Sequence, residues 1–336
     1  MGLKIAINGF GRIGRSLTRV AAFQEDIEIV AINDITDLDM MLYLLKYDSV
    51  HGNLDTKISK IDEKTISINN NKIKIFNKAD PKELDFGSLG VDVVFEATGI
   101  FLTQKEVQHH IDKGVKRVIL TAPTKDEITP TFVIGVNEKE YNNQKIISNA
   151  SCTTNCLAPI AMLLDRYFGI EKGLMTTIHS YTNDQNLLDS KHHGDIRRSR
   201  ASAINMIPTS TGAAKAVDLV LPQLKGKLHG QSVRVPTPDV SMMDLNLVVS
   251  KKTSKDELSA IFQQASEDEL KNILFLDKEK MVSQDILGLS YSTIVANDLL
   301  QVIDGDMIKI MAWYDNEWGY SNRLIEMAQY ILKQER

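Results

Sequence analysis

The sequence is poor in cysteine and lacks long apolar runs. Only two cysteines occur among its 336 residues, with no C-x-x-C pair or histidine-rich cluster of the kind that binds metal. No apolar run approaches the roughly 18 residues of a membrane span, so we expect neither a span nor a signal peptide. Unpaired cysteines suit a reducing compartment, which predicts a cytoplasmic protein.

A strong excess of one charge is also missing. The net charge is −5 and the pI is about 5.9, which argues against a general nucleic-acid binder. No internal repeat or low-complexity segment is visible. An apolar content of 43% and a charged content of 25% are ordinary for a globular protein, and 336 residues exceed what one hydrophobic core usually holds. Two domains are therefore expected.

A glycine motif follows the first apolar segment. Residues 3–8 are typical of a buried strand, and Gly9, Gly11 and Gly14 form G-x-G-x-x-G at the start of an amphipathic helix. Glycines there let the backbone approach a pyrophosphate at a helix N-terminus. The next apolar strand leads to Asp34, 20 residues after Gly14, where an acid can bind the adenine ribose and repel a 2′-phosphate. The pattern predicts NAD rather than NADP.

Strands and helices alternate through the N-terminal half. The apolar strand 92–96 leads to Thr98 and Gly99, and the apolar strand 117–120 ends at Thr121. This alternation is typical of a doubly wound parallel sheet, whose ligands bind at the carboxyl ends of the strands. We therefore expect these three residues to border the cofactor.

Cys152 lies where an apolar run gives way to a helical pattern. Ser151 can cap this helix, which places Cys152 in the first turn and Cys156 one turn further on the same face. Unpaired N–H groups and the helix dipole there favour a thiolate. From these residues alone, other interpretations stay open: small buried hydrophobic residues, a disulfide or half of a metal site. A disulfide at this spacing within a helix would strain the backbone.

Beyond the Cys152 helix, long alternating segments predict one large, mostly antiparallel sheet. A loop at 183–205 carries an arginine-rich run, and a loop this long inside a domain is usually functional. A turn at 69–71 predicts a hairpin within a smaller antiparallel insertion. The alternating segments lie at 56–61, 65–68 and 72–76 in the insertion and at 174–182, 232–235, 242–249 and 309–314 in the large sheet.

Four segments together, 8–15, 150–156, 179–185 and 313–320, resemble those of the phosphorylating glyceraldehyde-3-phosphate dehydrogenases. The resemblance covers essentially the whole chain. It implies an α/β architecture with two domains. They are an NAD-binding Rossmann domain at 1–151, on which a C-terminal helix at 317–336 packs, and an α+β catalytic domain at 152–316.

The resemblance implies a reaction and a role for each site residue. The family oxidises D-glyceraldehyde 3-phosphate to 1,3-bisphosphoglycerate with NAD and inorganic phosphate, in glycolysis and gluconeogenesis. Cys152 would form a thiohemiacetal and then a thioester, with His179 as the general base. No metal is expected. The cofactor would contact Gly9, Phe10, Gly11, Arg12, Ile13, Gly14, Asp34, Thr98, Gly99, Thr121 and Asn316. The substrate phosphate would contact Thr182, Asp184 and Arg234, and the attacking phosphate would contact Ser151, Thr153, Thr211 and Gly212, with Arg198 nearby.

The resemblance further implies a homotetramer in which the 183–205 loops pack between subunits. Two departures bear on the cofactor. Ala79 stands where many relatives have an arginine beside the adenine, which predicts weaker contacts with the adenine. Lys191 stands where strictly NAD-using relatives often have proline, so we expect it to tolerate a 2′-phosphate and to allow some use of NADP. Two rivals are an erythrose-4-phosphate dehydrogenase, which departs at phosphate-site threonines that are intact here, and a binding protein that has lost catalysis.

Overall fold

The computed structural model describes residues 2–334, so residues 1 and 335–336 of the predicted domain ranges lie outside the described part. The chain forms two compact units. Among the described residues, unit 1 comprises 2–132, 138–150 and 321–334, and unit 2 comprises 133–137 and 151–320. None of the helices in this part of the chain is long and apolar enough to cross a membrane.

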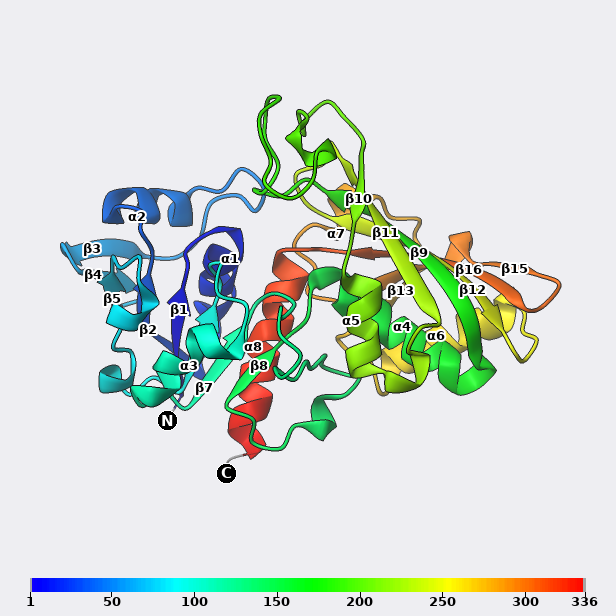
Figure 1. Ribbon diagram of the computed structural model, residues 1–336, viewed down its shortest axis with the longest axis horizontal. Helices are drawn as coiled ribbons and strands as arrows, with labels where there is room; N and C mark the ends of the chain where they lie inside the picture. Colours follow the sequence, from blue (N-terminus) through cyan, green and yellow to red (C-terminus); the bar gives the residue numbers. More distant parts are fainter. Residues whose placement is uncertain (1, 335–336) are drawn as a thin grey trace. The chain divides into compact units, whose positions relative to one another are not determined.

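Unit 1 is built on one sheet with the strand order β3-β4-β5-β2-β1-β6-β7-β8 (Figure 1). Neighbours from β5 to β8 pair in parallel, whereas β3, β4 and β5 pair antiparallel. From β5 onward this is the order of a doubly wound dinucleotide fold, and the order reverses between β1 and β6. The predicted parallel sheet and its antiparallel insertion are confirmed.

The strands of unit 1 begin and end close to their predicted residues. Both Asn69 and Asn70 have positive φ, as a tight hairpin turn requires. The bounds are β1 Leu3–Asn8, α1 Arg12–Ala21, β2 Ile27–Asn33, α2 Leu38–Lys46, β3 Ile58–Asp62, β4 Thr65–Ile68, β5 Asn71–Phe76, β6 Val93–Glu96, α3 Gln104–Asp112, β7 Arg117–Leu120, β8 Ile146–Ser148 and, from Ser321 on, α8 Trp318–Gln334.

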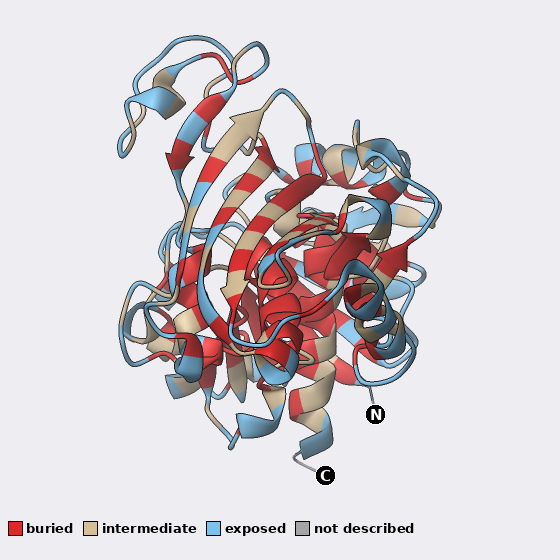
Figure 2. Cartoon of the chain, turned by 90° about the vertical axis from the view of Figure 1, so that its right-hand side faces the viewer, coloured by how far each residue is buried: buried red, intermediate tan, exposed pale blue. Residues whose placement is uncertain are grey.

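Unit 2 contains a second sheet with the order β10-β11-β9-β12-β16-β14-β13, and β15 pairs with β16. Buried and half-buried residues alternate along β12 and β16, as the banding in Figure 2 shows for this sheet. The helix α4 packs against β9, β12, β14 and β16. The bounds are α4 Cys152–Phe168, β9 Ile170–Ser180, β10 Ile207–Ser210, α5 Ala213–Val220, β11 Leu228–Val235, β12 Ser241–Val249, α6 Lys255–Glu267, β13 Leu274–Asp277, α7 Ser283–Ile286, β14 Thr293–Ala296, β15 Gln301–Ile303 and β16 Met307–Tyr314.

The second sheet is mostly antiparallel, as predicted, but two of its pairs are parallel. They are β11 with β9 and β13 with β14. The sequence analysis identified no strand at β13, β14 or β15. Each is only three or four residues long, and periodicity cannot separate so short an apolar run from part of a buried helix.

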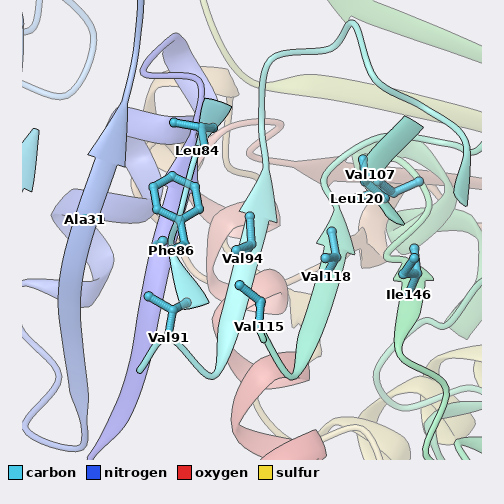
Figure 3. Close-up of a cluster of buried hydrophobic side chains, with 11 residues drawn as sticks. Ala31, Leu84, Phe86, Val91, Val94, Val107, Val115, Val118, Leu120 and Ile146 are labelled. Carbon is cyan, nitrogen blue, oxygen red and sulfur yellow. The ribbon is translucent and has the colours of Figure 1, made fainter. Parts of the chain in front are cut away.

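A cluster of apolar side chains packs on one face of the first sheet (Figure 3). Val94, Val118 and Ile146 come from the neighbouring strands β6, β7 and β8, and Val107 comes from α3. Beside this cluster, the His110 ring stacks on Phe86 with 5.6 Å between ring centroids. His110 is buried, and neither ring nitrogen has a hydrogen-bond partner among the described residues. Burial and the neighbouring His109 lower the pKa of His110 to about 3.

We predict that His110 makes the fold sensitive to acid. Because its pKa is 6.5 in the unfolded chain and about 3 in the folded one, burial of the neutral ring carries no protonation cost above pH 6.5, and the folded state loses stability as the pH falls below that value. His110→Phe keeps an aromatic ring stacked on Phe86 and removes the titratable group. Between pH 6.5 and 5, the free energy of unfolding should fall more steeply in the wild type than in this variant, by about 1.4 kcal/mol per pH unit.

Urea unfolding followed at several pH values measures this difference. His193→Gln removes an exposed histidine from the same chain and should leave the wild-type slope unchanged. Equal slopes for wild type and His110→Phe would show that His110 titrates normally in the folded state.

Candidate active site

Cys152 is the first residue of α4, and its position depends on a capped turn. Ala150, two residues before Cys152, has a left-handed backbone with φ of 56°. Ser151 is the N-cap, and its Oγ accepts a hydrogen bond from the Thr154 N–H at 3.1 Å. The predicted cap is therefore confirmed. Cys152 is partly exposed, whereas Cys156 is fully buried and its Sγ lies 3.4 Å from Thr293 Oγ1.

His179 faces the Cys152 sulfur from the end of β9. Its Nε2 lies 3.7 Å from Cys152 Sγ, and its Nδ1 lies 2.7 Å from the Ser180 carbonyl oxygen. A carbonyl oxygen can only accept, so Nδ1 must carry the hydrogen. The lone pair of Nε2 then points at the thiol. The structure thus places a general base next to a nucleophile, as the chemistry of both groups requires.

Burial acts on the protonation of both groups. It raises the pKa of the Cys152 thiol to about 11, although the Thr153 hydroxyl and the Arg234 charge act in the opposite direction. Burial and the Arg234 charge lower the pKa of His179 to about 3. Burial thus opposes the predicted stabilisation of a thiolate at the helix N-terminus. His179 Nε2 is positioned to take the proton of this thiol.

A buried tyrosine connects the first turn of α4 to the sheet through hydrogen bonds. The Tyr314 hydroxyl is hydrogen-bonded to Thr153 Oγ1 at 2.8 Å and to Thr177 Oγ1 at 2.7 Å. The Tyr314 ring also meets the His179 ring edge to face, with 6.0 Å between centroids. The Thr153 hydroxyl, which the resemblance implied for phosphate, is therefore bonded inside the protein. The group that Thr153 can offer to an anion is its N–H in the first turn.

Asn316 is held by two buried serines. Its Oδ1 accepts hydrogen bonds from Ser180 Oγ at 2.9 Å and from Ser241 Oγ at 2.7 Å. Ser241 Oγ also accepts the Ser180 N–H at 3.1 Å while it donates its own hydrogen to Asn316. This chain fixes the orientation of the amide. Its Nδ2 remains a donor for a ligand carbonyl, which fits the predicted contact with a nicotinamide carboxamide.

Arg234, Thr182 and Asp184 come together as predicted. The register of β11 on β9 pairs Arg234 with His179, and Arg234 donates to Thr182 Oγ1 at 2.7 Å. Thr182 in turn donates to Asp184. Arg234 Nε is buried and has no hydrogen-bond partner in the described part of the chain. A buried guanidinium with a donor to spare suits an anion such as phosphate.

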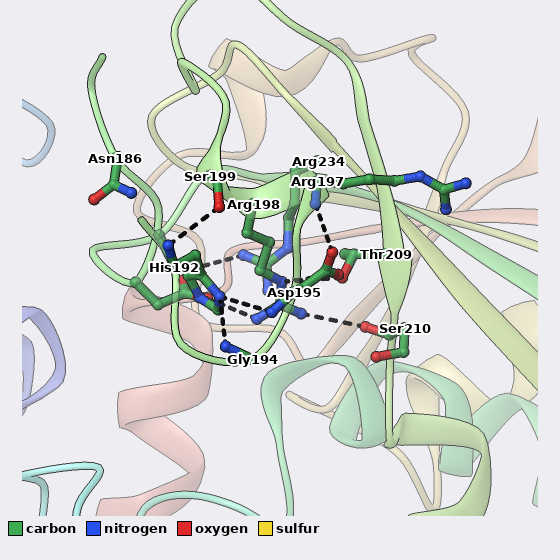
Figure 4. Close-up of polar contacts among 12 residues, drawn as sticks. Asn186, His192, Gly194, Asp195, Arg197, Arg198, Ser199, Thr209, Ser210 and Arg234 are labelled. Atoms are coloured by element: carbon green, nitrogen blue, oxygen red, sulfur yellow. Dashed lines mark hydrogen bonds and ion pairs between the residues drawn. The ribbon is translucent and has the colours of Figure 1, made fainter. Parts of the chain in front are cut away.

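Arg198 contacts a residue predicted for the substrate phosphate and the strand β10, and none of its hydrogen bonds in the described part of the chain goes to the residues predicted for the attacking phosphate. It donates to Asp184 at 2.7 Å and to Thr209 Oγ1 at 2.9 Å, and it reaches the Ser210 carbonyl at 3.4 Å (Figure 4). Burial raises the pKa of Asp184, but the Thr182 hydroxyl and the two arginines together lower it further, so the carboxylate stays ionised. Arg198 thus joins the predicted substrate-phosphate residues to β10.

Thr211 and Gly212 lie between β10 and α5. Gly212 is the N-cap of α5, and no side chain in the described residues caps this helix there. Thr211 Oγ1 accepts the Ala213 N–H at 3.2 Å. A Cβ added at Gly212 would meet no atom within 4 Å. An open helix start with a threonine hydroxyl beside it can bind an anion.

The glycine loop of unit 1 connects β1 to α1. Gly9 has φ of 99°, and a Cβ there would lie 2.6 Å from the Thr98 nitrogen. A Cβ at Gly14 would lie 2.0 Å from the Gly9 carbonyl oxygen, so both positions exclude any side chain. A Cβ at Gly11 would meet nothing within 4 Å, and no described side chain caps α1 at this residue. Only the Gly11 side of the loop is open to a ligand.

The other predicted cofactor residues of unit 1 surround this loop. Asp34 accepts hydrogen bonds from the Phe10 N–H at 2.6 Å and from the Thr36 N–H at 2.9 Å. Each of its oxygens keeps a lone pair for ribose hydroxyls. Arg12 pairs with Asp48 at 2.5 Å. Ile13 lies in the first turn of α1, Gly99 has φ of 71°, and Thr121 donates to the Glu96 carbonyl.

These residues fit a dinucleotide. The open helix start suits a pyrophosphate, the carboxylate after β2 suits a ribose, and both lie where the strand order reverses. Asn316 belongs to unit 2, where its amide is oriented to donate. Sequence reasoning missed the residues that hold the predicted ones, namely Tyr314, Ser180, Ser241 and Glu96. Their only signal was a polar side chain at the end of an apolar strand.

A dinucleotide-binding sheet and a cysteine–histidine pair in one chain define an NAD-dependent dehydrogenase that works through a thiol. Comparison with known proteins narrows this class. Residues 3–104 match the NAD-binding domain of glyceraldehyde 3-phosphate dehydrogenase, and residues 151–316 match its C-terminal domain. The chain belongs to the glyceraldehyde-3-phosphate dehydrogenase family.

Relatives that carry this name match over nearly the whole chain. One from Priestia megaterium is 50% identical over 334 residues, which are 98% of each protein. One from Bacillus subtilis is 49% identical over 335 residues, or 99% of each. A chloroplastic relative from Arabidopsis thaliana is 50% identical over 332 residues, 98% of this chain and 83% of the relative.

We predict that His179 controls the reactivity of Cys152. Without Nε2 the thiol has no base beside it, and burial keeps its pKa high. His179→Asn should slow alkylation by iodoacetamide at pH 7 by about 10-fold or more, and the rate should keep rising with pH beyond 9. Mass spectrometry of the labelled protein measures the rate at Cys152. The buried Cys156 provides the internal control and should remain unlabelled. An unchanged rate in His179→Asn would mean that the sulfur ionises without the imidazole.

Proposed function

We propose that the protein catalyses the phosphorylating oxidation of D-glyceraldehyde 3-phosphate to 1,3-bisphosphoglycerate, with NAD and inorganic phosphate, in glycolysis and gluconeogenesis. The observation that carries this proposal is the distance of 3.7 Å between Cys152 Sγ and His179 Nε2, with the free lone pair of the imidazole facing the thiol. The family membership and the two groups of anion-binding side chains support the choice of substrate.

In the proposed mechanism Cys152 is the nucleophile. His179 takes the thiol proton, and the sulfur adds to the aldehyde carbon to give a thiohemiacetal. The imidazolium returns this proton to the oxygen of the adduct, and His179, neutral again, then removes it from the thiohemiacetal hydroxyl as the carbon is oxidised to a thioester. The N–H groups in the first turn of α4 stabilise the negative oxygen in each step. Bound NAD supplies the acceptor for the hydride.

Phosphate completes the reaction by attack on the thioester, which releases the acyl phosphate and restores the thiol. Arg234 and Thr182 hold the substrate's own phosphate, and Arg234 is suited to this because its Nε has no partner in the described part of the chain. Thr211, Gly212 and the N–H groups of Ser151 and Thr153 bind the attacking phosphate. Arg198 adds positive charge between the two sites.

NAD is the preferred cofactor in this proposal because Asp34 lies at the end of β2 with both oxygens able to accept from ribose hydroxyls. A carboxylate there repels a 2′-phosphate. Lys191 is exposed on the 183–205 loop and could attract one, so residual NADP use is tested directly. The assay follows reduced cofactor at 340 nm with NAD or NADP, with and without phosphate, on glyceraldehyde 3-phosphate and erythrose 4-phosphate. Equal use of the two aldehydes would favour the sister enzyme, and no turnover would favour a binding protein.

A cytoplasmic homotetramer is part of the proposal. Both cysteines are free thiols, and the nucleophile must remain reduced. The 183–205 loop is tied to itself by polar contacts, including Arg200 to Asp189 at 2.8 Å. Its apolar side chains nevertheless face outward, with Ile196 90% exposed and Ile204 80% exposed. Such side chains suit a subunit interface. Sedimentation should give about four times the mass of one chain, and an active monomer would contradict this.

Substitutions should affect the two proposed anion sites independently. Losing a charge-assisted pair costs about 1.5–3 kcal/mol, so Arg234→Ala should impair oxidation of glyceraldehyde 3-phosphate by roughly 10- to 150-fold. Unphosphorylated glyceraldehyde does not use that contact, so its rate should fall much less, only through the lost effect of the Arg234 charge on the pKa values of Cys152 and His179. Thr211→Ala should raise the inorganic phosphate needed for turnover and spare the single-turnover burst of NADH.

Stopped-flow absorbance measures the burst, and steady-state assays measure the rest. Cys152→Ser is the control without a nucleophile: it should bind NAD and form no NADH. If Arg234→Ala impaired both aldehydes equally, or if Thr211→Ala suppressed the burst, the assignment of the two phosphate sites would be wrong.

A further inference from the structure

Glu96 is a buried carboxylate that the proposed mechanism does not use. It ends β6, one of the two strands between which the strand order of the first sheet reverses, and it is 1% exposed. Its Oε2 accepts from Asn8 Nδ2 at 2.6 Å across to β1, and its Oε1 accepts from the Thr98 N–H at 3.0 Å and from the Thr98 hydroxyl. Glu96 therefore joins the two loops that border the dinucleotide edge.

The hydrogen bonds extend from Glu96 to two further loops, and backbone groups fix their direction. The Lys78 N–H donates to Asn33 Oδ1 at 2.9 Å, and the Lys78 carbonyl accepts from Asn33 Nδ2 at 3.0 Å. Asn33 Nδ2 must then face Asn8 Oδ1, at 2.8 Å, which leaves Asn8 Nδ2 to donate to Glu96. At the other end, the Thr98 N–H can only donate. Both oxygens of Glu96 thus meet donors, which suits the ionised form.

A proton on Glu96 would disturb this arrangement. The only partner able to accept it is Thr98 Oγ1, which already receives the Ile100 N–H at 3.1 Å. The Thr98 hydroxyl would have to turn its own hydrogen away from Glu96, and the carboxyl would lose acceptor capacity toward its donors. Protonation therefore changes what Thr98 presents at the edge of the sheet and weakens the link between the loops after β1 and β6.

Glu96 can bind this proton near neutral pH because its carboxylate is buried away from water. Burial raises the pKa of Glu96 to about 7, against the hydrogen bonds from Thr98 and Asn8, and the charge of Glu106 on α3 adds to the rise. Other charged groups on the neighbouring elements are Asp34 after β2 and Lys78 after β5. Asp34 is engaged with two backbone N–H groups, and Lys78 pairs with Glu83 at 2.5 Å.

We propose that Glu96 is a positioning residue for the cofactor, and that NAD binds to the form of the protein in which Glu96 is ionised. The ionised carboxylate holds the loops after β1, β2, β5 and β6 in one arrangement, so binding of NAD expels a proton wherever Glu96 was protonated. Cofactor affinity then falls as the pH drops below 7. This inference rests on the NAD site proposed above.

The test is calorimetric titration of the full-length protein with NAD between pH 6 and 8. Because one group binds one proton, the dissociation constant can rise at most about 10-fold per pH unit below 7, and we expect a rise of about 3- to 10-fold from pH 8 to pH 6. Repeating the titration at pH 6.5 in buffers of different ionisation enthalpy counts the protons. We expect about half to one proton released per NAD bound.

Two variants test whether Glu96 is the group that releases the proton. Glu96→Gln keeps the shape of the side chain, but its new NH₂ group faces the donors of Asn8 and Thr98. This variant should bind NAD about 10-fold more weakly than the wild type at pH 8, and it should release no proton on binding. Glu106→Gln removes the neighbouring exposed carboxylate from α3 and should retain the wild-type proton release, with the same pH profile shifted slightly to lower pH.

The possible results distinguish the proposed NAD site from the proposed role of Glu96. Wild type that binds no NAD at any pH would refute the cofactor site itself. Wild type that binds NAD without releasing a proton, or Glu96→Gln with the wild-type pH profile, would refute the role of Glu96 alone. If Glu96→Gln did not fold, proton release by the wild type and by Glu106→Gln would still decide the matter.

Discussion

The pairing of β9 with its two neighbours is the constraint on which the thiol site depends. β11 runs parallel to β9 and sets Arg234 beside His179, and β12 runs antiparallel and brings Ser241 to the Ser180 N–H. A slip of one residue in either pairing would turn the imidazole to the other face of the sheet, away from the sulfur. The geometry of His179, of Arg234 and of the amide of Asn316 therefore follows from the register of these strands.

The two units share one kind of hydrogen-bond network. In each, polar side chains stand at the ends of apolar strands and bond to one another across the sheet. The Tyr314 hydroxyl does this in unit 2, and Glu96 with Asn8 does it in unit 1. Burying such groups is costly unless every donor finds an acceptor, so a satisfied network allows few arrangements. Rigid sites result, because moving one loop would leave several buried groups without partners.

Much of this structure could be predicted from local sequence. The cap at Ser151, the glycine loop and the asparagine hairpin each depend on residues within a few positions of one another, where propensity and sterics decide. The resemblance supplied the functional residues. Neither could supply contacts made by the tertiary structure, such as Thr153 of α4 to Tyr314 of β16 across 161 positions or Asn8 to Glu96 on paired strands across 88.

Two features of the structure lie beyond what local sequence pattern can predict. The parallel pairing of β11 with β9 cannot be read from alternation, because a strand alternates in the same way in either direction. The pKa of Cys152 depends on how much water reaches the sulfur, which the helix position does not determine. The same holds for Glu96, a polar residue that ends an otherwise apolar strand and whose burial only the tertiary structure reveals.

The carboxylate of Asp184 sits among the cations proposed to bind phosphate. It pairs with Arg198 and accepts from Thr182, which itself accepts from Arg234. The protein thus carries an internal anion that neutralises part of this cluster before any ligand arrives. A ligand must share these donors with Asp184, so the cluster discriminates by charge: a dianionic phosphate ester can compete for them, and a singly charged carboxylate metabolite gains little. Asp184 in this way filters the small anions that share the cell with the substrate.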